Sequence, residues 1–370
     1  MKKDWTYKKL GEVATIYDSQ RKPVTKKDRK PGPYPYYGAT GVQDYVDKYI
    51  FDGRYVLVGE DGARWSSNEK SAYIIEGKSW VNNHAHVLSF DNSIIDCFIV
   101  YYLNYSNLDS YITGAIIKKL TQKDLLSISI PIPPLSIQRS IVAELDLLHS
   151  VISKKKEQLC ELDNLAQSLF YQMFGDPITN PMGWEIKKLG EVALEKLSYG
   201  SGASAIDFDN EVRYVRITDI NDDGSLNENA VSPSVCEDKY LLHCGDILFA
   251  RTGATVGKTY LHLESAIKCI YAGYLIRFIP NIDIINPLYA FHFTKTQYYH
   301  DFVAQAQRAV AQPNINAQQY SNLPLPLPPL SLQQSFAAKV SAIEAQKQAI
   351  TQSIKETEAL LVQRMDTYFS

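Results

Sequence analysis

Two long stretches of the chain carry apolar residues in alternating steps of four and three, which is the spacing of a helix with one buried seam. They predict helices over 139–176 and 330–370. A single stripe of this kind is equally typical of a surface helix packed on a globular core, but two such stripes favour pairing of the helices with each other. Lys155 and Lys347 at seam positions would disfavour simple self-association and help to fix the register. The apolar seam positions are Leu145, Leu148, Ile152, Leu159, Leu162, Val340, Ile343, Ile350 and Ile354.

The remainder of the chain reads as short strands and short helices. Runs rich in β-branched and aromatic residues, bounded by glycine or polar turns, predict strands. These runs are 55–58, 72–75, 85–90, 214–217, 246–250 and 274–279. Apolar residues at helical spacing predict short helices over 96–105 and 287–298. We therefore expect a mixed α/β (α+β) fold, with the strand order left open.

The sequence also repeats itself. The motif KKLGEVA occurs at 8–14 and again at 187–193. PIPPLSIQ at 131–138 has a counterpart, PLPPLSLQ, at 326–333. Repeats of this length indicate two copies of one structural unit.

Between these anchors the two copies are less alike. YVLVGEDGA in the first copy aligns with ILFARTGA in the second, and the second copy has extra residues around 201–238. We expect two similar domains, 1–138 and 177–329, each followed by one of the long helices, 139–176 and 330–370.

The composition is that of an ordinary globular protein, because 45% of the 370 residues are hydrophobic and 21% are charged. The chain has no apolar run long enough for a membrane span and no signal-peptide core, which predicts a cytoplasmic protein. Its five cysteines form no CxxC pair, so we expect reduced thiols rather than disulfides or a thiolate zinc site.

The net charge of −3 argues against a uniformly basic nucleic-acid binder. The first domain is net basic and the second is net acidic. Residues 21–30 hold six basic residues and one acidic residue, a run that is usually a solvated face. Other basic residues near predicted loops are Lys118, Lys119, Arg251, Lys258 and Arg308. Locally basic surfaces are therefore the candidates for a nucleic-acid contact.

The segment DILFARTGATVGKT at 246–259 is a strand followed by a glycine-rich loop, as in many nucleotide-binding proteins. The Walker pattern requires GxxxxGK[ST], and the spacing from Gly253 to Gly257 is one residue short. The equivalent loop of the first copy has no Gly-Lys pair. We therefore expect no ATP site here, although such a loop with exposed backbone amides suits a nucleic-acid phosphate.

The motif NPLY at 286–289 is one residue from the NPPY signature of amino-methyltransferases. The first copy has no counterpart, and no glycine-rich cofactor loop opens a doubly wound sheet. A helix start explains the motif better, with Asn286 as the N-cap and Pro287 in the first turn.

His84 and His86 form an HxH motif that could bind a metal. No third ligand lies at a recognisable spacing, so we expect no metal site. Contact of Asn83 and His84 with base edges or phosphates, or plain structural hydrogen bonding, is the preferred interpretation.

Taken in order, these motifs resemble the specificity subunit of a type I restriction-modification system. The resemblance rests on the W..KKLGEVA opening, the loop GDILFARTGATVGK, the segment Q.NIN and the PLPPL box before a long helix, in a duplicated arrangement that covers essentially the whole chain. It implies two target recognition domains, each reading one half of a bipartite asymmetric site in double-stranded DNA. It also implies that the two helices pair as an antiparallel coiled coil that sets the spacer.

The resemblance further implies that the chain has no catalytic site and binds no cofactor. Two modification subunits would dock on it and methylate adenine with S-adenosylmethionine. Restriction subunits that use ATP and Mg²⁺ would join through the complex.

The side chains expected at the DNA come partly from the family motifs and partly from position. The motifs point to Arg251, Thr252, Thr255, Lys258, Gln312 and Asn314 in the second domain and to Arg64, Trp65, Lys118 and Lys119 in the first. Position adds Tyr36, Tyr37, Asn83, His84, Arg216 and Arg308. The first copy has Arg64-Trp65 after Ala63 and lacks a Gly-Lys pair, which leaves its phosphate contact open.

Two other classes of protein remain as alternatives. A fused DNA methyltransferase or nuclease would bind its cofactor through this chain alone, which the short Walker-like loop and the missing cofactor loop disfavour. A scaffold with two domains on a coiled coil could instead bind proteins or sugars, and polar loops alone do not exclude it.

Overall fold

The computed structural model describes residues 5–114, 116–308 and 314–370. The chain forms two compact units. Unit 1 comprises Met1–Lys155 together with Ser353–Ser370, and unit 2 comprises Lys156–Gln352. Each unit therefore contains one copy of the repeat and part of both long helices. Within the described ranges, no helix combines the length and the apolar composition needed to cross a membrane.

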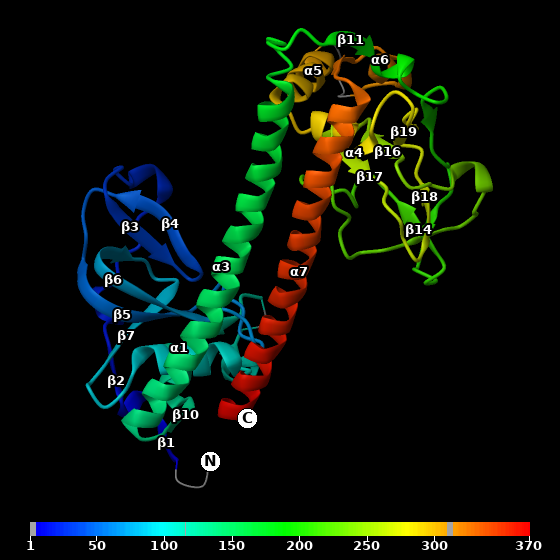
Figure 1. Ribbon diagram of the computed structural model, residues 1–370. Helices are drawn as coiled ribbons and strands as arrows, with labels where there is room; N and C mark the ends of the chain where they lie inside the picture. Colours follow the sequence, from blue (N-terminus) through cyan, green and yellow to red (C-terminus); the bar gives the residue numbers. More distant parts are fainter. Residues whose placement is uncertain (1–4, 115, 309–313) are drawn as a thin grey trace. The chain divides into compact units, whose positions relative to one another are not determined.

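Unit 1 is built on a six-stranded sheet with the order β2-β7-β5-β6-β3-β4 (Figure 1). The elements are β2 (Ala14–Ile16), β3 (Tyr34–Gly38), β4 (Gly41–Val46), β5 (Phe51–Gly59), β6 (Ala72–Val81), β7 (Ala85–Phe90), helix α1 (Asp96–Tyr105), β8 (Ile112–Thr113), β9 (Lys119–Leu120) and α2 (Gln122–Ser127). β3 and β6 run parallel, and the other pairs in the sheet are antiparallel. Alternate residues of β5 face opposite sides, so Val56 and Val58 pack with Phe98 of α1, whereas Leu57 packs with Val87 on the other face.

Unit 2 contains a four-stranded antiparallel sheet with the order β12-β19-β16-β17 and two small ladders, β13-β15 and β14-β18. The elements are β12 (Ser198–Tyr199), β13 (Ala205–Ile206), β14 (Val212–Val215), β15 (Ser232–Pro233), β16 (Ile247–Ala250), β17 (Thr259–Leu261), β18 (Lys268–Tyr271), β19 (Leu275–Phe278), and helices α4 (Pro287–Phe293), α5 (Gln297–Arg308) and α6 (Ala317–Ser321). Strand β16 alternates as β5 does: Phe249 packs in the cluster that holds Tyr289 of α4, and Leu248 faces the opposite cluster. The extra residues of the second copy form β13, β14 and β15.

Both units are closed by the same two-stranded antiparallel ladder, β1 with β10 in unit 1 and β11 with β20 in unit 2. These strands are β1 (Thr6–Lys9), β10 (Ser129–Ile132), β11 (Glu185–Lys188) and β20 (Pro324–Leu327). Just after β1, the amide of Leu10 donates to the carbonyl of Ile128 at 2.8 Å. Just after β11, the amide of Leu189 donates to the carbonyl of Leu323, also at 2.8 Å. The two repeated motifs are therefore neighbours in each copy, where they join the start of the unit to its end.

A buried glutamine links each proline box to a short helix. Gln138 is 1% exposed, and its amide oxygen accepts from Ile95 N–H at 2.9 Å while its amide nitrogen donates to Pro133 O at 2.9 Å. Gln333 is fully buried and makes the equivalent bonds, to Asn286 N–H at 2.8 Å and to the preceding proline carbonyl at 2.7 Å. The glutamine that ends each box thus holds the box against the start of the short helix.

The long helices are α3 (Leu135–Phe174) and α7 (Leu330–Phe369), each 40 residues long. In unit 1, Glu144 of α3 pairs with Arg364 of α7, and the ammonium group of Lys155 donates to Ser353 Oγ at 2.6 Å. Because the partner numbers fall along α7 as they rise along α3, the two helices pair antiparallel here, as predicted.

The same helices also pair inside unit 2, where Lys347 forms an ion pair with Asp163 at 2.7 Å and Phe170 packs edge-on against Phe336. Both seam lysines, Lys155 and Lys347, therefore bond across the seam. The apolar seam positions are all buried or half-buried: Leu145, Leu148, Ile152, Leu159, Leu162, Val340, Ile343, Ile350 and Ile354.

Most predicted elements are present, but several differ in their bounds; β5 and β6, for example, extend beyond the predicted 55–58 and 72–75. Helix α1 and strand β7 match their predictions. The helix predicted over 287–298 is two helices, because the Thr294 hydroxyl donates to Phe291 O at 2.7 Å and that of Thr296 donates to Phe293 O at 2.7 Å. The first long helix begins earlier than predicted and ends before Gly175, whose φ of 77° is left-handed. The strand predicted over 214–217 lies two positions earlier, as β14.

Candidate nucleic-acid interface

Strand β5 of unit 1 ends in a loop that two main-chain hydrogen bonds hold in place. The amide of Glu60 donates to the carbonyl of His84 at 2.9 Å. The carbonyl of Glu60 accepts from the amide of Leu120 at 2.8 Å. Most of the residues predicted to contact DNA in unit 1 lie around this strand end.

Strand β16 of unit 2 ends in the same way. The amide of Arg251 donates to Tyr274 O at 3.1 Å, and its carbonyl accepts from Ile315 N–H at 2.9 Å. Arg251 and Glu60 are therefore structural equivalents, as the alignment of the two copies indicates. The same backbone position carries a carboxylate in one unit and a guanidinium group in the other.

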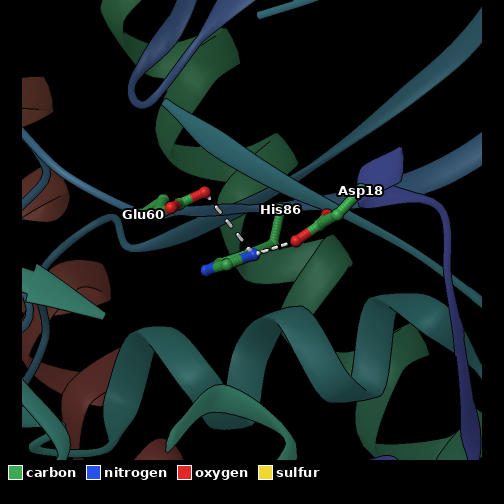
Figure 2. A group of neighbouring side chains, drawn as sticks. All are labelled: Asp18, Glu60 and His86. Carbon is green, nitrogen blue, oxygen red and sulfur yellow. Dashed lines mark hydrogen bonds and ion pairs between the residues drawn. The ribbon is translucent and has the colours of Figure 1, made fainter. Parts of the chain in front are cut away.

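Glu60 lies in a buried network of charged side chains (Figure 2). It is 7% exposed, and its two carboxylate oxygens accept from Arg21 at 2.5 Å and from Lys119 at 2.6 Å. The Arg21 guanidinium also pairs with Asp18 at 3.1 Å, and Asp18 accepts from His86 Nδ1 at 2.5 Å. Four segments that are distant in sequence are thereby joined at one strand end.

Hydrogen bonds decide the charge states in this network. Burial by itself would raise the pKa of Glu60, but the bonds from Lys119 and Arg21 outweigh burial and leave that pKa below its ordinary value. His86 Nε2 donates to Leu120 O at 2.8 Å while Nδ1 faces the Asp18 carboxylate. The ring therefore links a main-chain carbonyl to a buried carboxylate.

Asp18, Glu60 and His86 place three potential metal-ligand atoms within 4.8 Å of one another. Both carboxylates, however, already bond to Arg21 or Lys119, and these cations supply the positive charge that a metal would bring. The arrangement therefore suits an internal ion network better than a cation site. The two histidines of the HxH motif also differ in surroundings, because His84 is exposed and pairs with Asp61 at 2.5 Å.

Two of the residues predicted to contact DNA in unit 1 belong to its core. Tyr36 is 1% exposed, and its hydroxyl accepts from Val24 N–H at 3.0 Å. Trp65 is 5% exposed, and its indole nitrogen donates to Gly59 O at 3.1 Å. Burial excludes a direct DNA contact by either side chain in this conformation.

The other predicted residues of unit 1 are more accessible. Asn83 and Lys118 are exposed, Tyr37 is half-buried, and the exposed Arg64 makes only a long ion pair of 3.6 Å. Lys119 is bound to Glu60, so its charge is compensated.

A short hairpin, β8 with β9, carries the basic pair Lys118 and Lys119. Next to them, Ile116 is 97% exposed and Ile117 is 70% exposed. Sequence reasoning missed these two isoleucines, although an apolar pair beside two lysines in a turn was a readable signal. Exposed apolar side chains of this kind are unusual on a surface that has no partner.

In unit 2, the guanidinium group of Arg251 lies between two aromatic rings. Its central carbon is 4.8 Å from the centroid of the Tyr199 ring and 5.9 Å from that of Tyr274. The side chain borders a surface pocket of about 660 Å³ that Arg216 also lines. Two of the predicted DNA-binding arginines thus meet at one pocket, together with Tyr274, which sequence reasoning did not single out.

Other predicted cations of unit 2 are held by acids. Arg216 forms a bidentate pair with the buried Asp219, with a shortest distance of 2.8 Å. The hydrogen bonds that Arg216 donates to Asp219 raise the pKa of Arg216. Lys258 pairs with Asp222 at 2.8 Å and donates to Ile220 O at 3.2 Å, so it fastens the inserted segment to the loop.

The remaining predictions for unit 2 concern the loop and its neighbour. Thr252 forms an isolated antiparallel β-bridge with the exposed Asn314. The Thr255 hydroxyl donates to Thr252 O at 3.2 Å. Arg308 is the last residue of α5. Gln312 lies outside the described residues. The loop Gly253–Thr255 is a short 3-10 turn rather than a phosphate-binding loop before a helix, in line with the short Walker spacing.

Comparison with known proteins identifies the family. The family described as "Type I restriction modification DNA specificity domain" matches residues 2–162 and 181–358. A type I restriction enzyme specificity subunit of Haemophilus influenzae is 41% identical over 148 residues, which is 40% of this chain and 38% of that protein. The MjaVIII specificity subunit of Methanocaldococcus jannaschii is 23% identical over 92% of this chain and 86% of its own length.

The fold agrees with solved structures over the whole chain. The S subunit of a type I restriction-modification system from M. genitalium has a TM-score of 0.64 at 12% identity, covering 99% of this chain and 96% of that one. Since the family match occupies most of both repeats, this chain belongs to the type I restriction-modification DNA specificity family.

Proposed function

We propose that this chain is the DNA-reading subunit of a cytoplasmic type I restriction-modification complex. Each unit reads one half of a bipartite, asymmetric DNA site, and the paired helices set the number of unread base pairs between the halves. The observation that carries the proposal is the equivalent strand end in the two units, with the same backbone and different side chains. One fold used twice with different reading groups recognises two different half-sites.

Charge distribution supports a reader that acts inside a larger assembly. The net charge is −3, and several predicted DNA-contacting cations, among them Lys119, Arg216 and Lys258, are paired with acids. Because these cations are already compensated, they would release few counterions on binding, so the isolated chain should bind DNA weakly and with a shallow salt dependence. Partner subunits would supply the remaining phosphate contacts.

Catalysis belongs to those partners in this proposal. Two modification subunits dock on the chain and methylate adenine with S-adenosylmethionine, and restriction subunits that use ATP and Mg²⁺ join through the complex. The Walker-like loop supports this division, because its lysine, Lys258, is tied to Asp222 and is not free for a nucleotide phosphate.

The test is to map methylated bases. The chain is combined with the modification subunit encoded beside it and S-adenosylmethionine, and a DNA library is read by long-read sequencing. The proposal expects a split motif with an unread gap. Removing one heptad around Asp163 and the facing heptad around Lys347 should shorten the gap by about three base pairs, because seven helical residues span about 10.5 Å. A contiguous motif, or a formed complex that methylates nothing, would contradict the proposal.

A further inference from the structure

Arg251 is held in one orientation by its surroundings. Its guanidinium group lies over the Tyr199 ring, with Tyr274 at the other side. Tyr199 is itself fixed, because its hydroxyl accepts from Ala317 N–H at 3.1 Å at the start of α6. A flat cation against two aromatic faces loses its rotational freedom without being neutralised.

Among the described residues, the guanidinium group of Arg251 also has no counter-ion. Among the residues that the structure describes, no carboxylate or carbonyl accepts a hydrogen bond from it, and its buried Nε atom has no partner. The other arginine of the same pocket, Arg216, is held by Asp219. Arg251 is therefore positioned by stacking and keeps its N–H groups available for a ligand.

Small residues line part of the pocket beside Arg251, among them Gly202, Ala203 and Gly273. The Tyr214 hydroxyl donates to Ser201 O at 2.8 Å and holds the backbone next to Gly202. Small side chains at this side of the pocket leave space for a base edge to approach the guanidinium group.

We propose that Arg251 is the guanine-reading residue of unit 2 and that Tyr199 and Tyr274 are the residues that aim it. The guanidinium group donates two parallel hydrogen bonds, to O6 and N7 of one guanine in the half-site of unit 2. This inference rests on the proposed function. A guanidinium group that is held in one orientation and is not neutralised suits bidentate pairing with guanine, which is the commonest specific contact to a base edge.

Unit 1 provides the internal control. Its residue at the equivalent position, Glu60, is buried and neutralised by Arg21 and Lys119. Changes at Arg251 should therefore alter only the half-site of unit 2 and leave the half-site of unit 1 as it is.

The experiment compares methylation motifs of complexes assembled with the full chain and with the variants Arg251→Lys, Arg251→Ala and Tyr199→Phe. Arg251→Lys keeps the charge but not the two-pronged geometry. It should relax one guanine position by about 10-fold or more, the loss expected for one bidentate contact. Arg251→Ala should relax the same position and lower the rate as well. Tyr199→Phe keeps the ring but loses the bond to Ala317, so it should relax that position less.

A matched control is Lys239→Ala, which removes another cation that lies over a tyrosine ring of unit 2, at 4.7 Å from Tyr240. Lys239 is already paired with Glu237, so its loss should leave the motif unchanged. Thermal unfolding of each variant checks that unit 2 is folded. If Arg251→Ala does not fold, the Arg251→Lys variant still provides the test.

The outcomes separate the inference from the function it rests on. A wild-type split motif that folded Arg251→Lys and Arg251→Ala complexes reproduce, with only a uniformly lower rate, would make Arg251 a phosphate contact and overturn the inference. Relaxation in the half-site assigned to unit 1 would overturn it as well. A wild-type complex without any split motif would refute the proposed function, and this inference with it.

Discussion

At the end of strand β5, unit 1 places Glu60 in a buried ion network, whereas at the end of β16 unit 2 places Arg251 between two tyrosines. The main-chain bonds that hold the two positions are the same. Because the fold depends there on amides and carbonyls, the side chain can change from acid to base without altering the backbone. The backbone of this loop is therefore the same in both units, while the side chain at its first position differs.

The opposite holds at the end of each proline box, where both units carry a glutamine. Gln138 and Gln333 make equivalent bonds to the start of α1 and the start of α4. There the side chain itself supplies the bond, so its identity is fixed in both copies. The glutamines of the two repeated proline boxes therefore have a structural role.

The largest expected effect comes from removing the carboxylate of Glu60. Glu60→Ala would leave Lys119 without its acid and Arg21 with Asp18 alone, and should cost unit 1 on the order of 3 to 5 kcal/mol. Arg251→Ala, at the equivalent position, should cost unit 2 far less because no acid depends on it. Hydrogen exchange followed by mass spectrometry, read over β5 and over β16, measures both. Equal losses would show that the two strand ends are not held as differently as their side chains indicate.

Acid should lower the free energy of unfolding of unit 2 by about 3 kcal/mol. Burial lowers the pKa of His292 to about 4 from an ordinary value near 6.5, with Lys295 and Lys347 adding to the effect. A depressed pKa means that the unfolded chain takes up the proton first. Unit 2 should therefore hold its full stability above pH 6.5 and lose about 3 kcal/mol as the pH falls to 4.

Hydrogen exchange of α4 should therefore rise as the pH falls from 6.5 to 4. His292→Gln removes the titrating group and should flatten the response of unit 2 while leaving unit 1 unchanged. A response of α4 that His292→Gln does not alter would assign the acid sensitivity to carboxylates instead.

Loss of the glutamine that ends the proline box should destabilise both units equally. Gln138→Ala and Gln333→Ala each leave a buried amide and a buried carbonyl without a partner, at a cost of about 2 kcal/mol in each unit. The loss should be local, with faster exchange at α1 in the first variant and at α4 in the second. If one variant were neutral, the two proline boxes would not be equivalent despite their shared sequence.

The sequence was sufficient for the parts of the fold that local signals encode. The heptad seams predicted the paired helices, and Asn286 with Pro287 predicted the start of α4, where the Asn286 side chain accepts from Leu288 N–H at 2.9 Å. The break between α4 and α5 was missed. Thr294 and Thr296 bond back to Phe291 and Phe293 at this point, and Thr294 also bonds to the Thr259 hydroxyl at 2.7 Å, a long-range partner that the sequence pattern does not show.

The site was harder to predict for the same reason. Residues 21–30 had the composition of a solvated face, yet the Arg21 side chain is only 12% exposed because Asp18 and Glu60 bind it. Arg251 was found through its motif, but Tyr199 lies on a separate strand and no spacing connects the two. Residue type thus indicated candidates, while long-range contacts decided which cations are free.

The smallest expected effect concerns the helix pair. Lys347 pairs with Asp163 across the seam in unit 2, and also with Glu344 on its own helix at 3.0 Å. Burial by itself would lower the pKa of Lys347, but these two acids raise it above its ordinary value. Asp163→Asn removes only one of the two acids, so unit 2 should lose about 0.5 kcal/mol at low salt, and less at high salt where partly exposed pairs are screened. Urea unfolding at two ionic strengths measures this difference. A much larger loss, unaffected by salt, would mean that Asp163 positions Lys347 for register rather than merely neutralising it, and the two helices would then be specified by their charged seam positions as much as by their apolar ones.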